Sequence, residues 1–455
     1  MIRTILYREI YDGITSFTFL SVLVLLTVLV PLSAYIQAQY YRQVIADYTV
    51  RQSIHEAENS AYAVVITRPV PPLLPLFNSV YDSLPDEITL RSDSASRALS
   101  SEDLRPLDWL FPRIDLGIIV GVLMTLMAIL LGHDAVTGER EQGTLKLVLS
   151  SPVSKNTILF AKLMGVVGLM LIGLIYTVML YVLMLTASSG GAFALSAPRL
   201  FEISILMLIA ILTVVVFASL SVVISTMVKH SSVALALSIS IWVATVLIWP
   251  TLGPYIAATF WPVPPRQAVQ HEILNKEAAL IHEEISDHKR AAAELKASNT
   301  DVEVAWQRFL EIKRHWIERK KADIEDLTAS RTRQIGDQQM RARTILSLSP
   351  YGAFTEGLGT LCGTGLEGHN LFLASAEQYE REQFISASFQ YLEKEKPWMS
   401  NTGTASSFEL PPFQMPLSSL SERVQGLVIP VLFLLLEIGI VLGIGFLRFV
   451  RHGEG

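Results

Sequence analysis

Six long apolar runs interrupt this chain, and its polar residues gather between them. An α-helix rises about 1.5 Å per residue, so crossing about 30 Å of hydrocarbon takes roughly 20 apolar residues. The pattern therefore predicts an all-α polytopic membrane protein with six transmembrane helices. We place them at residues 14–36, 114–132, 157–187, 202–228, 231–249 and 424–447.

The end of the fifth span is predicted from its prolines. Pro250 and Pro254 follow Trp249 closely. A proline inside a helix lacks the backbone N–H that the helix needs, and its ring clashes with the preceding turn. We therefore expect the fifth helix to end at Trp249.

Residues 1–13 precede the first span and predict a short helix of their own. Ile2, Ile5, Leu6 and Ile10 fall on one side of it, which is typical of an amphipathic helix lying at the membrane surface. A plain tail is the alternative. The apolar run that follows is longer than the core of a cleavable signal peptide, about 7–15 residues, so we expect it to remain as an anchor.

The basic residues of the short connecting segments all fall on one side of an alternating six-span chain. They are Arg3, Arg8, Arg140, Lys146, Lys155, Lys229, Arg448 and Arg451. The positive-inside rule makes that side cytoplasmic. Both termini, including the tail 448–455, are then expected in the cytoplasm, and the long segments 37–113 and 250–423 are expected outside.

The first long segment, 37–113, begins without glycine or proline, so we expect the first span to continue as a helix to about Ser60. Tyr62–Thr67 then reads as a short strand, because it is rich in β-branched residues. The segment is thus predicted to project from the membrane.

The second long segment, 250–423, predicts a mainly helical domain. Two long helices, Gln267–Ala297 and Asp301–Arg343, carry apolar residues at helical spacing, and a third is expected near Leu371–Lys396. We expect the first two to bury their apolar stripes on each other as an antiparallel hairpin. The stripe of the first helix comprises Ile273, Leu274, Leu280, Ile281, Ile285 and Leu295.

Composition supports a membrane protein with some water-exposed mass. Hydrophobic residues make up 51% of the chain and charged residues 17%, whereas a soluble domain has about 25% charged residues. A net charge of −6 gives no basic surface of the kind that binds nucleic acid. The single cysteine excludes a disulfide scaffold.

Several enzyme motifs fail on inspection. Gly138–Gly143 has the glycine spacing of a P-loop, but Thr144 and Leu145 stand where the motif requires lysine and a hydroxyl residue. Gly363–Gly368 matches G-x-G-x-x-G without a surrounding βαβ unit, so we expect a flexible loop there. The His-Glu pairs lack the second histidine of a zinc peptidase. The sequence therefore predicts no catalytic residue, metal site or cofactor on this chain.

Residues 133–156 connect the second and third spans. Two acidic residues precede a short apolar run, which Pro152 ends, so the pattern predicts a helix of about two turns with an apolar ridge. The ridge consists of Leu145, Val148 and Leu149. It either rests on lipid headgroups or docks into a groove of a soluble partner, and the spacing alone favours neither.

The string from Asp134 to Lys155, followed by Lys162 at the head of the next span, resembles the ABC-2-type transporter permease family. The resemblance rests on the acidic pair, Gly-Thr-Leu, Pro-Val-Ser and a closing lysine at this place between two spans, and it extends to the turn Ser225–Ser231. More narrowly, the chain is similar to ABC-2 permeases with large extracytoplasmic segments, those linked with gliding motility and copper-enzyme maturation.

The resemblance implies a coupling helix seated on a separate ABC ATPase subunit, which binds ATP and Mg. The residues matching that helix are Glu139, Arg140, Glu141, Gly143, Thr144, Leu145, Val148, Leu149, Pro152 and Lys155. It also implies a second copy of the chain or a sister permease, a place in the bacterial inner membrane, and export more often than import. This chain itself is not expected to be an enzyme.

Glu437 is the one charge deep inside a predicted span. Burying it there costs roughly 2.5–3.5 kcal/mol on insertion scales, so it should face protein or water rather than lipid. It either lines the transport pathway or a dimer seam, or is a protonated glutamate bonded to a neighbouring serine, threonine or tyrosine.

The long outer hairpin leaves a second function open. Transport alone does not require such helices. They are also expected in a complex that does not transport and that transmits ATP-driven motion to an extracytoplasmic protein partner.

Overall fold

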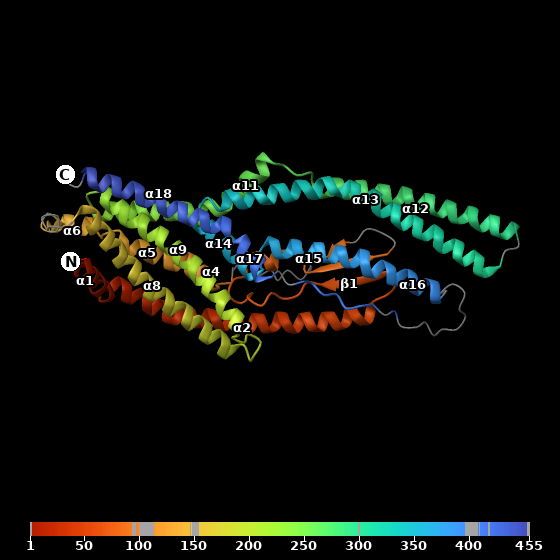
Figure 1. Ribbon diagram of the computed structural model, residues 1–455, viewed down its shortest axis with the longest axis horizontal. Helices are drawn as coiled ribbons and strands as arrows, with labels where there is room; N and C mark the ends of the chain where they lie inside the picture. Colours follow the sequence, from red (N-terminus) through yellow and green to blue (C-terminus); the bar gives the residue numbers. More distant parts are fainter. Residues whose placement is uncertain are drawn as a thin grey trace.

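The computed structural model describes most of the chain, and its helices dominate. The described residues are 2–92, 97–99, 113–145, 147, 154–298, 301–395, 408, 410–416 and 419–452. A helical bundle forms one end of the elongated molecule, and a second, mainly helical region extends from the other end (Figure 1). We call the second region the protruding domain; it comprises α2 beyond Tyr41, the three strands, α12, α13, α15 and α16.

Among the described residues, six segments are long and apolar enough to span a membrane, which confirms the predicted fold class. Their elements are α2 (Phe17–Glu58), α4 (Leu116–Ile118), η2 (Ile119–Met124), α5 (Thr125–Gly132), α6 (Thr137–Glu141), α8 (Lys155–Ser188), α9 (Ala197–Met227), α10 (Ser231–Trp242), η3 (Val243–Ile248), α11 (Trp249–Phe260), α17 (Leu420–Gly426) and α18 (Val428–His452). Both chain ends lie at the same end of the bundle as α6 (Figure 1).

The predicted end of the fifth helix at Trp249 is wrong. A π-helical turn, η3, leads directly into α11, which continues the helix to Phe260. Pro250 directly follows this π-helical turn, and such a local adjustment accommodates the hydrogen bond that proline cannot make. Pro254 lies inside α11. Such a proline is accommodated in membrane proteins because groups of neighbouring helices bond the backbone groups that it leaves free.

The N-terminal segment is a helix, α1 (Ile2–Ile14), as predicted. It packs along α8, where glycines let the two backbones approach closely. A Cβ atom added to Gly165 would lie 2.7 Å from the Cβ of Glu9. The position of α1 at a membrane surface stays a prediction.

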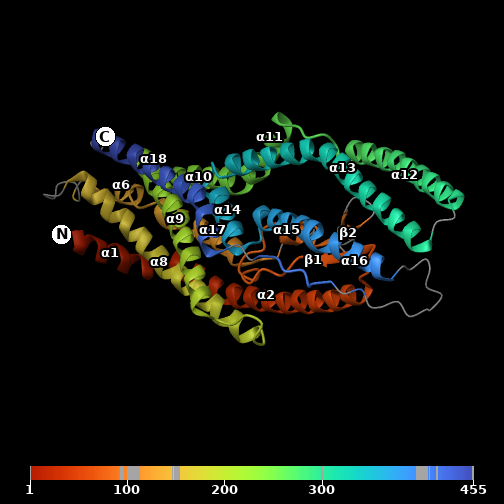
Figure 2. The same cartoon turned by 45° about the vertical axis from the view of Figure 1, so that its right-hand side comes forward.

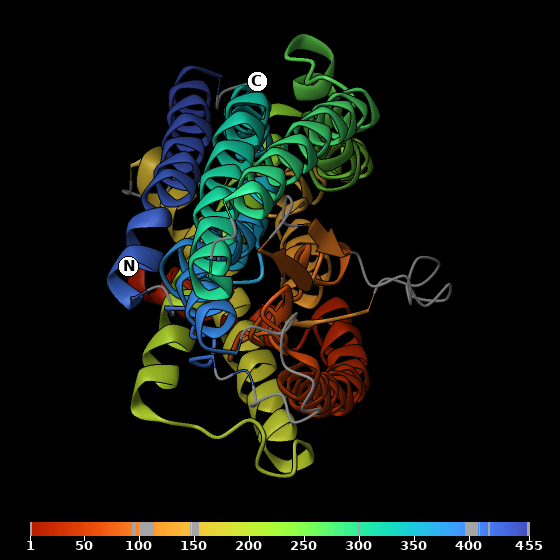
Figure 3. The same ribbon diagram turned by 90° about the vertical axis from the view of Figure 1, so that its right-hand side faces the viewer.

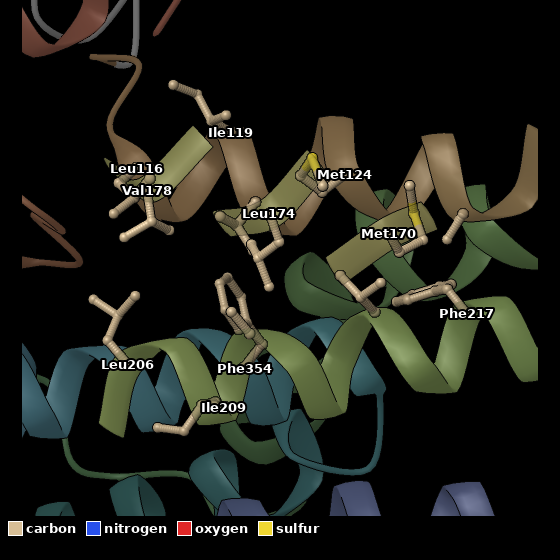
Figure 4. Packing of buried hydrophobic residues seen from close by; sticks show 14 of the residues in the cluster. Leu116, Ile119, Met124, Met170, Leu174, Val178, Leu206, Ile209, Phe217 and Phe354 are labelled. Atoms are coloured by element: carbon tan, nitrogen blue, oxygen red, sulfur yellow. The ribbon is translucent and has the colours of Figure 1, made fainter. Parts of the chain in front are cut away.

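Helix α14 (Pro350–Cys362) is buried among the spans, and the sequence pattern did not predict it. Ten of its 13 residues are buried. It packs against α9 and α18, and Figure 4 shows Phe354 pointing into the apolar core, towards Leu174 and beside Ile209. This helix therefore fills space at the protruding end of the bundle.

Gly363–Gly368 forms the tight turn between α14 and α15 (Leu366–Tyr379), so the predicted flexible loop is wrong. Gly363 ends α14 with a φ of 69°, a left-handed conformation that favours glycine. A Cβ atom on Gly368 would lie 2.3 Å from the carbonyl oxygen of Gly363. The glycines serve close backbone packing there.

The protruding domain contains a three-stranded antiparallel sheet in the order β1-β2-β3. Its strands and remaining short elements are β1 (Ala63–Thr67), β2 (Glu87–Arg91), β3 (Arg97–Leu99), η1 (Tyr81–Ser83), η4 (Glu380–Phe384) and α16 (Ile385–Glu395). The strand expected at Tyr62–Thr67 is confirmed as β1, one residue shorter. One face of the sheet packs on α15 and η4 in a small core that includes Ile66 and Phe372.

The predicted hairpin is present. Helices α12 (Arg266–Ala297) and α13 (Val302–Leu346) run antiparallel away from the bundle (Figure 2). Seen end-on, they lie on the opposite side of the protruding domain from α2 (Figure 3). The expected third helix packs beside them, because Leu392 of α16 contacts Trp306 and Leu310.

The predicted apolar seam of the hairpin is only partly right. Leu280 is buried against α13, but Leu274, Ile281 and Ile285 are all partly exposed. Glu284 takes the inward position instead, since its carboxylate pairs with Lys313 and Lys320 of α13. An ion pair thus occupies part of the seam, and an apolar stripe of α12 faces outward.

Candidate functional site

Helix α6 is fixed to the last turns of α9. The backbone N–H groups of Val136 and Thr137 both donate to Ser225 Oγ at 3.0 Å. All three residues are fully buried, and a buried N–H group requires such a partner. The start of α6 therefore cannot move without α9.

The end of α6 is fixed to the turn between α9 and α10. Arg140 donates to the carbonyl oxygen of Val228. Glu141 Oε1 accepts from the backbone N–H of Ser231, at 2.8 Å, and lies 3.6 Å from His230 Nδ1. A carboxylate at this place also meets the positive end of the α10 dipole.

A third connection runs through Lys162 of α8, which is 3% exposed. Its Nζ atom lies 2.9 Å from Glu139 Oε1 and 3.0 Å from Glu9 Oε1. An ammonium group buried without a partner costs several kcal/mol, so the two carboxylates compensate its charge. One lysine thereby joins α1, α6 and α8.

Together these side chains connect five helices, α1, α6, α8, α9 and α10, at the α6 end of the bundle. We call the group the junction; it consists of Glu9, Glu139, Arg140, Glu141, Lys162, Ser225 and the turn Val228–Ser231.

The chain turns sharply after α6. Gly143 has a φ of 73°, and the hydroxyl of Thr144 donates back to the carbonyl oxygen of Glu139 at 3.2 Å. As a result Leu145 points into the main apolar core and is only 9% exposed, whereas Leu147 is 75% exposed.

The prediction that Leu145 belongs to an outward ridge is therefore wrong, because the glycine turn folds it back onto the spans. Val148, Leu149 and Pro152 lie outside the described residues. Lys155 is the first residue of α8, whose N-cap is Ser154.

The sequence singled out Glu139, Arg140 and Glu141, and the structure gives each of them a partner in another element. The contribution of Glu9 was missed. The sequence did mark Lys162 as unusual, since it is a charged residue within the buried face of an otherwise apolar helix.

Glu437 lies on the side of α18 that faces α9. One turn earlier Leu434 is fully buried, and two turns later Gly445 packs against Val223. The Oε2 atom of Glu437 is buried and has no hydrogen-bond partner among the described residues. The glutamate therefore faces protein, and this oxygen does not form the local hydrogen bond that a purely structural role requires.

The fold and the junction together define a multi-pass membrane protein whose spans are fastened to a short helix at one end. The family model for ABC-2 family transporter proteins matches residues 3–453. The chain belongs to that family and is a permease subunit of an ABC transporter, a class that works with an ABC ATPase subunit. No curated protein sequence matches the chain.

Proposed function

We propose that this permease is the transmembrane half of an ATP-driven exporter in the bacterial inner membrane. ATP and Mg bind on the separate ATPase subunit, and this chain transmits the resulting motion. A second copy or a sister permease completes the pathway. Both termini and the junction face the cytoplasm, and the protruding domain lies outside, as in ABC-2 permeases with large extracytoplasmic segments.

The junction is the observation that carries this proposal. The exposed residues Thr144 and Leu147 follow closely on α6. Helix α6 is held by charged or buried hydrogen bonds to α8, α9 and the start of α10, and Lys162 of α8 connects it to Glu9 of α1. Packed helices respond to such displacements as bodies rather than bending continuously. A push on Glu139–Lys155 is therefore passed to several spans at once.

Leu147 tests the docking part of the proposal. We expect Leu147→Asp to reduce co-purification of the ATPase subunit at least about tenfold, because a charge in an apolar contact must be desolvated without a partner. Leu147 is exposed, so thermal unfolding of the permease alone should not change.

Leu145→Asp is the matched comparison, since it introduces the same charge two residues away. Leu145 lies in the core, so this variant should lower the unfolding temperature of the permease itself. If Leu147→Asp retains the ATPase fully, the exposed side of this segment is not the docking surface.

Glu437→Gln tests a role in the pathway or at the dimer seam. Glutamine keeps the shape but loses the charge, so the protein should insert and assemble normally. We expect substrate-stimulated ATPase activity to fall about tenfold, because the variant removes an ionisable group from inside the membrane. Unchanged stimulation would leave Glu437 with a structural role only.

The exposed stripe of α12 supports a second candidate function. Leu274, Ile281 and Ile285 recur at helical spacing on a surface that the chain itself leaves open. Such a stripe fits a complex that moves the hairpin against an extracytoplasmic protein partner without transporting a substrate.

A truncated hairpin separates the two functions. Lys276 and Asp323 form an ion pair at 3.3 Å across α12 and α13, so residues 277–322 can be replaced by a short Gly-Ser linker at that level. If the chain is an exporter, we expect the variant to keep both ATPase stimulation in proteoliposomes and the cellular phenotype of the wild type. If the hairpin instead acts on an extracytoplasmic partner, ATPase stimulation persists but the cellular phenotype of the wild type is lost.

A further inference from the structure

A groove of about 590 Å³ lies between α2 and β1 in the protruding domain. One wall is a single face of α2, formed by Tyr48, Gln52, His55 and Asn59, which recur every three or four residues. Its volume falls within the range of about 300–1,000 Å³ that is typical of ligand sites. The elements that form it, β1 and the outer end of α2, lie in the protruding domain, away from α6 (Figure 1).

The second side of the groove is the free edge of the sheet. Four consecutive residues of β1, Val64–Thr67, line it. Within the described part of the chain, the strand order places β1 at an edge, with β2 as its neighbour on one side only. An edge strand presents unpaired backbone groups, which pair readily with another extended chain.

The register of the sheet identifies which backbone groups are free. Arg68 N donates to the carbonyl oxygen of Asp86, and Ser92 N donates to that of Tyr62, so even-numbered residues of this strand bond to β2. In an antiparallel pair, the backbone N–H and C=O groups of the alternate residues point away from the partner strand. The backbone N–H and C=O groups of the odd-numbered residues therefore face the free edge.

Only part of that edge is open. Ser60 closes its beginning, because the N–H of Ala63 donates to Ser60 Oγ and the carbonyl oxygen of Ala63 accepts from Ser60 N. The outward backbone groups of Val65 and Thr67 have no partner among the described residues. Two successive positions of a strand are thus left to pair, about 7 Å apart.

Three polar side-chain atoms of the groove also have no partner among the described residues. They are Thr67 Oγ1, His55 Nδ1 and Asn59 Oδ1, all buried as atoms. Thr67 is only 8% exposed as a residue. Buried polar atoms are usually hydrogen-bonded, because an unmade bond is costly. These atoms indicate a ligand that supplies donors and acceptors.

The third wall is apolar and cannot itself pair with β1. Phe408, Leu410 and Phe413 pack on the small core beneath the sheet. Pro411 and Pro412 stand between them, and proline has no backbone N–H to donate to a strand. This segment is therefore suited to contact side chains rather than to complete the sheet.

We infer that the groove binds an extended segment of an extracytoplasmic polypeptide by adding it as a strand beside β1. Main-chain bonds to Val65 and Thr67 hold the segment, and its alternate apolar side chains contact Phe408 and Leu410. This is strand addition at a sheet edge, in which main-chain bonds give affinity and side-chain contacts give selectivity. The binding itself does not depend on the chain being an exporter.

The test begins with the full-length protein in lipid nanodiscs and a phage-displayed library of random dodecapeptides. Enriched peptides are synthesised with a fluorophore and titrated. Val65→Pro should weaken binding at least about tenfold, because it removes the outward donor while the β1–β2 hydrogen bonds remain. Val65→Thr keeps the N–H and the β-branched shape and should bind within about twofold of wild type.

A second measurement does not rely on the proline variant folding. Methylation of single peptide N–H groups should weaken binding to the wild-type protein at alternate positions only, since a strand presents alternate groups to its neighbour. Benzoylphenylalanine in place of Tyr48 should cross-link the peptide, whereas the same probe at Ile54, which is exposed on α2 and does not line the groove, should not.

Three results would overturn the inference. One is a library that yields no peptide above background. Another is binding that is weakened neither by peptide methylation nor by Val65→Pro, when this variant is as stable as the wild type. The last is a cross-link from position 48 to the protein's own chain that added peptide does not reduce, because the groove would then already be filled.

Discussion

Replacing Lys162 with methionine should uncouple the permease from its ATPase. The change removes the ammonium group that joins Glu9 and Glu139 and leaves both carboxylates without their cation. Breaking a buried ion pair typically costs about 3–5 kcal/mol. Both carboxylates keep some solvent contact, so we expect about 3 kcal/mol of lost stability.

The functional effect follows from the same geometry. Without Lys162, α6 keeps its hydrogen bonds to α9 and α10 but loses its ion-pair connection to α8 and, through it, to α1. Permease-dependent stimulation of ATPase activity in the reconstituted complex should then fall about tenfold or more. Both the unfolding temperature in detergent and this stimulation are to be measured.

Two controls separate the network from a general loss of charge. Arg448→Met neutralises an exposed arginine at the same end of the bundle, outside the junction, and should change neither quantity. Adding Glu9→Gln and Glu139→Gln to Lys162→Met removes the unpaired carboxylates and should restore most of the stability. If the Lys162 variant matches the wild type in both unfolding temperature and ATPase stimulation, the junction does not transmit motion from the ATPase to the spans.

The spans could be predicted from the sequence because a single constraint, the thickness of the hydrocarbon layer, sets their length and composition. The hairpin helices could also be predicted, because the spacing of their apolar residues is a local property of the sequence. The ends of helices were less predictable. Pro250 and Pro254 read as breakers, but tertiary packing and a π-turn keep the fifth helix continuous.

The candidate site was predictable in its residue types and not in its contacts. The motif around Glu139 marks the segment, but no spacing rule tells that Lys162 and Glu9 meet there across 153 positions. Leu145 shows the same limit. Its place in an apolar run suggested a ridge, and only the left-handed turn at Gly143 directs it into the core.

Helix α14 was missed for a related reason. It is short and glycine-rich, so its pattern matches neither a span nor an amphipathic surface helix. Its burial comes from neighbours that lie far away in the sequence, in α9 and α18. It also follows α13 directly, and Arg343 of α13 pairs with Glu356 of α14 at 2.7 Å. It therefore links the hairpin to the bundle.

Gly352→Ala should disrupt this link severely. A Cβ atom at Gly352 would lie 1.9 Å from the carbonyl oxygen of Leu346, the last residue of α13. That atom belongs to the backbone, so no side-chain rotation relieves the clash. The N-cap bond from Gly352 N to Ser349 Oγ, at 2.9 Å, would be strained as well. We expect a loss of about 3 kcal/mol or more, measured as a lower unfolding temperature.

Gly336→Ala makes the same chemical change ten residues before the end of α13 and should act in the opposite direction. No atom lies within 4 Å of the added Cβ, and alanine stabilises a helix interior by about 0.5–1 kcal/mol relative to glycine. If both variants unfold alike, the close approach of α13 and α14 is wrong. A selective loss at Gly352 would show that the backbones of α13 and α14 pack closely at this point, as the structure indicates.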